Sequence, residues 1–167
     1  MARLGCVTMR RHKLAAVAAV GLIYAAAAQA SPEAPMAQGV IRVPSAFTFD
    51  ETVTRIEAAV RANKIRFFGE IDQANLAAGA RIKLLPSKLL LFGNPPLGVQ
   101  LLTSNPYAGL DWPVRMLVRQ DADGAVWVAY TDFGFIAHRY GITDRDAVVA
   151  MATKVSALVA SSASGGP

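Results

Sequence analysis

The chain has few of the side chains that bind transition metals. Its 167 residues include one cysteine, Cys6, and two histidines, of which His12 precedes residue 31. The rest of the sequence therefore keeps His138 and no thiol. A Cys/His zinc site, an iron–sulfur cluster and a methionine-rich copper site all lack ligands, and only a carboxylate site for calcium or magnesium stays open; we expect no metal and no cofactor.

Motifs of nucleophilic catalysis and of phosphate binding are missing as well. The sequence contains no Gly-x-Ser-x-Gly, no Ser-x-x-Lys and no Gly-x-x-x-x-Gly-Lys. A serine triad would have to use His138, which adjoins Arg139 in an expected short helix and is expected to face solvent. Asp121-Ala-Asp-Gly124 begins like a calcium loop, but no acidic residue follows before Asp132, which favours a plain turn.

Acidic residues are absent from residues 1–30, which contain Arg3, Arg10, Arg11 and Lys13. The formal net charge of +5 comes mostly from this segment, because the remaining chain has 13 basic side chains (17 − 4) against 12 acidic ones. A net charge of +1 (13 − 12) does not create a field that attracts phosphates, so we expect no nucleic-acid partner.

The same segment has the pattern of a secretory signal peptide. Its basic residues precede an uncharged run, Leu14–Ala28, and the small-residue motif Ala28-Gln29-Ala30. The run is shorter than the roughly 20 residues that a helix needs to cross a bilayer, which favours cleavage over an uncleaved anchor. We expect residues 1–30 to be removed, the protein to be periplasmic or extracellular, and the mature chain to have no membrane partner.

Composition marks the ends of the domain that follows. Residues 31–44 are expected to form a linker with a possible first strand at Val40–Val43, and residues 161–167 are expected to form a flexible tail. One domain is expected between them, over residues 45–160.

Apolar periodicity in this domain alternates between helix and strand. Two period-two segments flank Asp121–Gly124 and predict a hairpin, and a continuous apolar run predicts a strand covered on both faces. Asp50 is expected to cap one helix, and Thr143 with Asp146 to cap the last. The strands are expected over residues 65–71, 88–92, 114–119 and 126–131, and the helices over residues 50–63, 73–80, 100–103, 133–140 and 143–160. The pattern predicts an α+β fold, a single compact domain with an antiparallel or mixed β-sheet and helices packed on it.

Polar side chains gather at the expected strand ends and turns. Paired carboxylates among them could serve as general acid and base if a pocket separated their pKa values. Each also has a structural explanation, since aspartate caps helices, asparagine closes turns and arginine pairs with carboxylates. Both explanations stay open for the residues concerned, which are Glu70, Asp72, Asn94, Asp111, Arg115, Tyr130 and Asp132.

The turn Phe92-Gly-Asn-Pro95 is expected to form the floor of a cleft. Gly93 should permit a backbone angle that other residues resist, and the following proline should hold Asn94 in an extended conformation. A fixed amide beside Asp72 and Asp111 would suit a polar ligand.

The order of these blocks resembles a known family. In sequence, Ile71-Asp72 precedes Phe92-Gly-Asn-Pro95 with Gly98, then Leu110-Asp111-x-Pro113, then the turn Asp123-Gly124 and Tyr130. This order is similar to the family catalogued as domain of unknown function 302. The resemblance spans about residues 45–160 and implies a compact α+β fold that associates as a homodimer, with no established activity. The positions that it singles out are Asp72, Asn94, Asp111, Pro113 and Tyr130.

Two positions depart from the family pattern. Gln73 stands where the family commonly has a histidine, and Trp112 stands where it usually has an aliphatic residue, which would narrow or cap the site. Glutamine orients a ligand but does not transfer protons near neutral pH, so we expect a dimeric module that binds a small polar ligand or a partner. The alternatives are a purely structural dimerisation domain and a small hydrolase or isomerase with paired carboxylates. The expected ligand-binding residues are Asp72, Gln73, Asn94, Asp111 and Tyr130.

Overall fold

The computed structural model describes Met1 and residues 38–165. Apart from Met1, the expected signal peptide and most of the expected linker lie outside the described residues. The described part of the chain contains no helix that is long and apolar enough to cross a membrane. Its elements are β1 (Val40–Pro44), α1 (Phe49–Ala62), β2 (Arg66–Asp72), α2 (Gln73–Gly79), β3 (Ser87–Gly93), α3 (Pro95–Ser104), the 3₁₀ helix η1 (Pro106–Leu110), β4 (Val114–Gln120), β5 (Val126–Thr131), α4 (Phe133–Arg139) and α5 (Asp146–Ser161).

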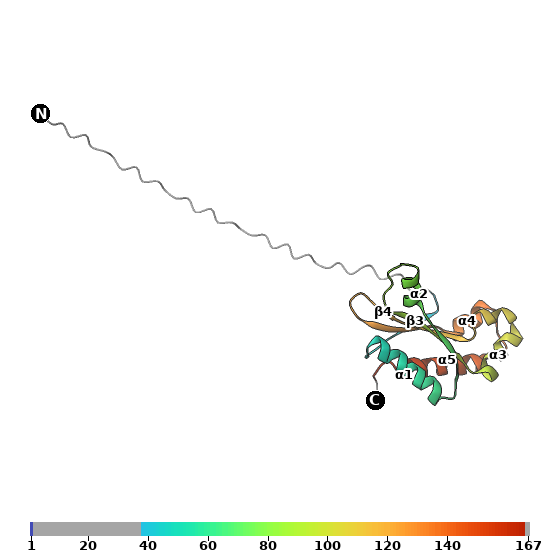
Figure 1. The fold of residues 1–167 in the computed structure, drawn as a ribbon. Helices are drawn as coiled ribbons and strands as arrows, with labels where there is room; N and C mark the ends of the chain where they lie inside the picture. Colours follow the sequence, from blue (N-terminus) through green and yellow to red (C-terminus); the bar gives the residue numbers. More distant parts are fainter. Residues whose placement is uncertain (2–37, 166–167) are drawn as a thin grey trace. The chain divides into compact units, whose positions relative to one another are not determined.

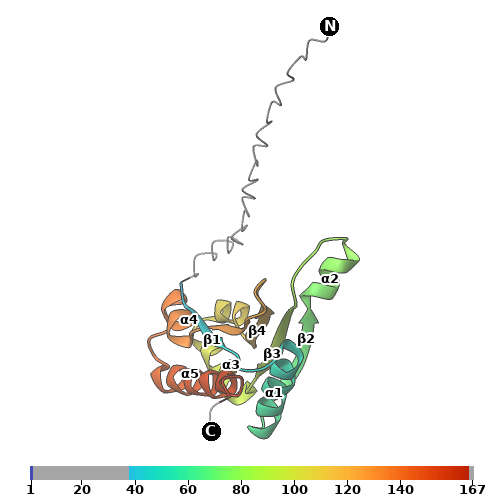
Figure 2. The same cartoon turned by 90° about the vertical axis from the view of Figure 1, so that its left-hand side faces the viewer.

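The strands form one antiparallel sheet in the order β1-β5-β4-β3-β2. Helices α1 and α5 lie against one face of this sheet (Figures 1 and 2). Figure 2 shows α2 at the far end of β2, away from α1 and α5. This architecture confirms the predicted α+β class, including the hairpin of β4 and β5 and its turn at Asp121–Gly124.

Alternation along the strands places apolar side chains in a core between the sheet and the two long helices. Burial of each large aliphatic or aromatic side chain contributes about 1.5–3 kcal/mol to folding. The most buried members are Leu90 and Phe92 of β3, Met116 and Val118 of β4, Val128 of β5, Ile56 and Val60 of α1, and Val159 of α5.

Two details of the sheet correct the sequence analysis. The strand β3 is covered fully on one face, because α1 and α5 pack on one face of the sheet, and Leu89 and Leu91 on its other face are half-buried. Phe68 interrupts the alternation of β2 because the register with β3 shifts between Phe67 and Gly69, which is a β-bulge.

Two predicted helix caps differ from the structure, whereas Asp72 caps α2 as expected. The N-cap of α1 is Thr48, whose hydroxyl accepts the Glu51 N–H at 3.4 Å, and Asp50 lies inside the first turn, where its charge favours the positive helix end. The helix α5 begins at Asp146 without a side-chain cap, so the expected box with Thr143 is wrong.

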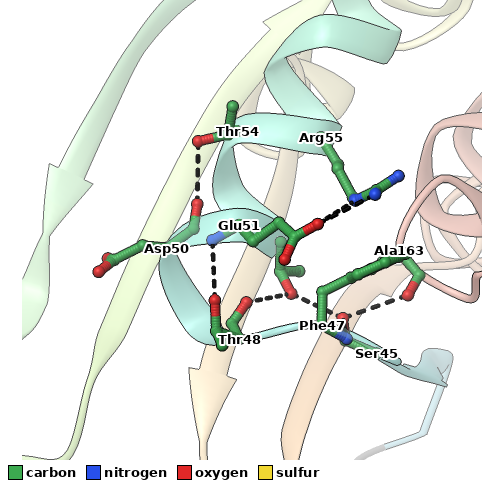
Figure 3. Close-up of polar contacts among 9 residues, drawn as sticks. Ser45, Phe47, Thr48, Asp50, Glu51, Thr54, Arg55 and Ala163 are labelled. Atoms are coloured by element: carbon green, nitrogen blue, oxygen red, sulfur yellow. Dashed lines mark hydrogen bonds and ion pairs between the residues drawn. The ribbon is translucent and has the colours of Figure 1, made fainter.

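The segment that follows α5 packs against the start of α1 (Figure 3). The Ala163 carbonyl accepts the Ala46 N–H at 2.9 Å and the Ser45 hydroxyl at 3.2 Å, and Ala163 is fully buried. The Ser45 hydroxyl lies 2.6 Å from the Thr52 hydroxyl of α1. The expected flexible tail therefore contains an ordered part of the domain up to at least Ala163.

Candidate functional site

The two most specific sequence blocks meet at one end of the sheet. The indole of Trp112 lies directly on helix α3, so that a Cβ built on Gly98 would fall 1.7 Å from the indole Nε1. A Cβ on Gly93 would lie 3.3 Å from the same atom. The other edge of the indole faces Phe68, with ring centroids 5.8 Å apart at 74°. Gly93 therefore provides space for Trp112, and it does not have the positive φ angle that we expected.

Beneath Trp112 lies a narrow apolar slot between α3, α5 and the sheet. Its cavity volume is about 20 Å³, which is room for about one water, within about 340 Å³ of space that includes open solvent, so a larger ligand enters only if the lining moves. None of the described side chains that line it is ionisable. The lining residues are Ile65, Phe92, Gly93, Asn94, Leu97, Gly98, Trp112, Val114, Phe133, Ala152, Val155 and Ser156.

One polar group in the wall of this slot, covered by its neighbours, has no hydrogen-bond partner. The Ser156 side chain belongs to α5, the residue is 1% exposed, and its hydroxyl forms no hydrogen bond with any described residue. A buried polar group that lacks a hydrogen bond destabilises a protein by about 1–3 kcal/mol. Such groups are rare in native proteins and mark positions that a water or a ligand completes.

The loop that carries Trp112 is held by the preceding carboxylate. The Asp111 side chain is 6% exposed, and its Oδ1 accepts a hydrogen bond from Arg115. Its Oδ2 accepts from Arg139 Nη1 at 3.2 Å and from the Tyr140 hydroxyl at 2.7 Å. Because both oxygens are engaged, Asp111 anchors the loop and is not available as a general base.

Two tyrosines near this end of the sheet are held in the protonated form. The hydrogen bond to Asp111 raises the pKa of Tyr140, and partial desolvation adds to this effect. Burial raises the pKa of Tyr130, assisted by the charge of Asp132. Tyr130 lies in the core opposite Met116 and outside the lining of the slot, so the structure does not place this expected ligand residue at the site.

Asp72 and Gln73 lie at the opposite end of β3 from the slot. Asp72 pairs with Lys88 in the register, and Asn94 comes six residues later, a separation of about 20 Å along a strand. Asp72 accepts the Asn75 N–H at 2.8 Å as the N-cap of α2, and the Gln73 Oε1 accepts the Ser87 hydroxyl at 2.7 Å. The structure thus does not form the single cleft that we expected from Asp72, Asn94 and Asp111.

Asn94 stays at the rim of the slot. Its backbone is extended, as predicted from Pro95, but its exposed side chain makes no capping hydrogen bond to α3. The first two residues of α3 are prolines and the next two N–H groups donate to the Asn94 carbonyl, so this helix start offers no free donors to an anion.

The positions of Asp72 and Asn94 predict different losses of stability for their substitution by alanine. Asp72→Ala should lower the free energy of unfolding by about 1 kcal/mol, because it removes the cap of α2. Asn94→Ala should change it by less than about 0.5 kcal/mol, as for an exposed side chain without a partner. Urea unfolding of both variants measures the difference, and equal losses would contradict the assignment of Asp72 as a cap.

Three residues of this region were not predicted from the sequence to belong to a site. Arg139 and Tyr140 follow the expected short helix, and nothing in their spacing links them to Asp111 before the chain folds. Ser156 left a weak signal, since it lies four residues after Ala152 on the apolar stripe of the last helix. A serine on the buried stripe of a helix needs a hydrogen-bond partner, and this need is the signal that could have indicated a site.

The chain belongs to the family described as domain of unknown function DUF302, whose family model matches residues 41–161. The fold is similar to the crystal structure of an uncharacterized conserved protein DUF302 from Bacillus stearothermophilus, with a TM-score of 0.69 and 16% sequence identity over 76% of this chain and 99% of that one. At this identity the likeness concerns the fold alone.

The chain is also similar to part of curated proteins that are named as ion channels. The protein named fluoride-specific ion channel FluC 1 from Brucella suis biovar 1 (strain 1330) is 32% identical over 117 residues, which cover 69% of this chain and 46% of that protein. A FluC 1 from Brucella abortus biovar 1 (strain 9-941) has the same identity over 43% of its length. The chain spans less than half of these relatives.

Proposed function

We propose that this domain is a binding module whose slot beneath Trp112 holds a small molecule with an apolar body and one hydrogen-bonding group. The observation that carries the proposal is the Ser156 hydroxyl, which is buried without a partner among apolar side chains. A ligand that supplies the missing hydrogen bond gains from the slot both apolar burial and relief of that unsatisfied group.

The composition of the slot supports binding without chemistry. Acid–base catalysis requires a titratable group within hydrogen-bond reach of the substrate, and the described lining has none. Both oxygens of the neighbouring Asp111 are engaged, and Asp72 lies at the other end of β3. Asp72 and Asp111, one carboxylate pair suggested for a hydrolase or isomerase, therefore do not meet at this slot.

Fluoride, which the curated relatives are named for, does not match this slot. A small and strongly hydrated anion leaves water only for a site with several donors or a cation. The described lining is mostly apolar and contains no cationic side chain. The slot therefore lacks the groups that would bind the ion for which these relatives are named.

Removal of the Ser156 hydroxyl tests the proposal at two levels. In the ligand-free protein, Ser156→Ala should raise the free energy of unfolding by about 1 kcal/mol, because it deletes a stranded polar group. Phenol and toluene are suitable probes, since they share an aromatic ring and differ in the hydroxyl. Phenol affinity should fall about threefold to tenfold in the variant, whereas toluene affinity should not fall.

A matched control for this substitution lies in the same helix. Ser161 is exposed and donates locally to the Leu158 carbonyl, so Ser161→Ala should leave phenol affinity unchanged. NMR titration locates the probe, and the shifts should centre on residues 92–98, 112 and 152–156. A loss of stability in Ser156→Ala, with phenol bound elsewhere or equally well, would refute the binding site.

We also propose that the protein is exported and cleaved after Ala30, on the basis of the basic start, the apolar run and Ala28-Gln29-Ala30. N-terminal sequencing of protein from the extracytoplasmic fraction should then begin at Ser31. A start near Met1 in a membrane fraction would contradict cleavage.

A further inference from the structure

Helix α2 and the loop after it expose an unusual amount of apolar surface. Within α2, all of which the structure describes, no side chain is buried. The exposed aliphatic residues of this region are Ile71, Leu76, Ile82, Leu84 and Leu85, with exposed fractions from 39% to 63%. We call residues 71–86 the α2 arm, and Figures 1 and 2 show its helix on the side of the domain away from α1 and α5.

The α2 arm is held in this position by specific hydrogen bonds. Asp72 caps the start of α2, and the Ser87 hydroxyl donates to Gln73 at 2.7 Å, which closes the base of the arm. The Ile82 N–H donates to the Ala77 carbonyl at 2.8 Å, which folds the loop back on the helix. Asp72 and Gln73, two of the five residues that the sequence suggested as ligand-binding, thus fix the shape of an exposed surface.

The size of this surface is that of an interaction site. Summed over these five aliphatic residues, the exposed area is on the order of 500 Å², which is the range of the largest contiguous apolar patches on monomeric proteins. A seven-residue helix is too short to be stable through its backbone alone, and helices in proteins owe most of their stability to packing of an apolar face. A partner that covers Leu76 would supply that packing.

The charges of the arm select the kind of partner. Arg81 and Lys83 lie among the exposed aliphatic residues, and neither forms an ion pair with any described residue. The arm has one carboxylate, Asp72, which accepts the Asn75 N–H as the cap of α2, and no acidic residue follows it before Asp111. In a two-fold dimer centred on this surface the same patch would face itself, so two pairs of unpaired cations would meet. Charge complementarity therefore favours an anionic surface that also accepts aliphatic side chains.

We propose that the α2 arm docks on a lipid surface with anionic headgroups. Ile82, Leu84 and Leu85 enter the boundary between headgroups and acyl chains, while Arg81 and Lys83 contact the headgroup phosphates. Binding of this type is reversible and weakens as salt rises, because part of it is electrostatic. It differs from the expectation of no membrane partner for the mature chain, and it does not depend on the slot beneath Trp112.

Cosedimentation with vesicles tests this proposal. The protein is taken from the soluble fraction with its N-terminus determined, and it is mixed with phosphatidylcholine vesicles that contain or lack phosphatidylglycerol. The wild type should bind the vesicles with phosphatidylglycerol, and Ile82→Asp with Leu84→Asp should weaken this binding about tenfold or more. Replacing Arg81 and Lys83 by glutamine should remove the dependence on phosphatidylglycerol and on salt.

The matched control is Leu158→Asp on α5, whose side chain is as exposed as Leu84 but lies on the helical layer. It should bind vesicles like the wild type, and thermal unfolding confirms that each variant is folded. Absence of wild-type binding, or an equal loss in the control, overturns the proposal. Light scattering that shows a dimer dissociated by the substitutions at Ile82 and Leu84, with vesicle binding unchanged, would assign the arm to a second copy instead.

Discussion

Substitution of Asp111 by alanine is expected to lower the free energy of unfolding by about 2–4 kcal/mol, the largest loss for any single carboxylate of this domain. The carboxylate is 6% exposed and accepts hydrogen bonds from Arg115, Arg139 and Tyr140. Its removal leaves two guanidinium groups without their counter-charge, although both are about half exposed and regain some hydration. Urea unfolding measures the loss.

The control for this substitution is a carboxylate with the same type of partner but little burial. Asp144 is 57% exposed and pairs with Arg145, so Asp144→Ala should change the free energy of unfolding by less than about 1 kcal/mol. Similar losses for the two variants would mean that the Asp111 network does not anchor the loop that carries Trp112.

The effect of Gly98→Ala on the free energy of unfolding is expected to change sign with the residue at position 112. A Cβ on Gly98 would fall 1.7 Å from the Trp112 Nε1, so in the wild type the substitution should displace the indole and lower the free energy of unfolding by about 1–3 kcal/mol. With Trp112→Ala the contact is gone, and the same substitution should raise stability by about 0.5–1 kcal/mol, because alanine favours a helix over glycine.

The four proteins of this double-mutant cycle give the coupling between the two positions, which should be about 1.5–4 kcal/mol. Displacement of the indole should also open the slot, so phenol should bind faster to Gly98→Ala than to the wild type. If Gly98→Ala had the same effect in both backgrounds, Trp112 would not lie on α3 as the structure has it.

Most of the fold could be predicted because local periodicity determines it. Val126, Val128 and Tyr130 alternate with Trp127, Ala129 and Thr131, and the turn before them contains Gly124, so the hairpin follows from the sequence. The helix caps could not be predicted as well, because Thr48 and Asp50 are both suitable capping residues two positions apart. The choice between them depends on where the preceding strand ends.

The site was harder to predict because it depends on which residues lie at the same end of the sheet. Asp72 and Asn94 both lie at ends of strands, but β2 and β3 are antiparallel, so the end of one strand meets the start of the next. Asp72 therefore pairs with Lys88 at one end, and Asn94 lies at the other. The sequence located Trp112 as a residue that caps a site, but its contact with Gly98 emerges only in the fold.

A crystal structure of the protein soaked with phenol shows whether the slot beneath Trp112 binds a ligand. We expect the phenol ring in this slot, with its hydroxyl within about 3 Å of the Ser156 Oγ, a normal hydrogen-bond distance. A slot that stays closed after soaking, with the Ser156 hydroxyl bonded to a backbone carbonyl of α5, would contradict it.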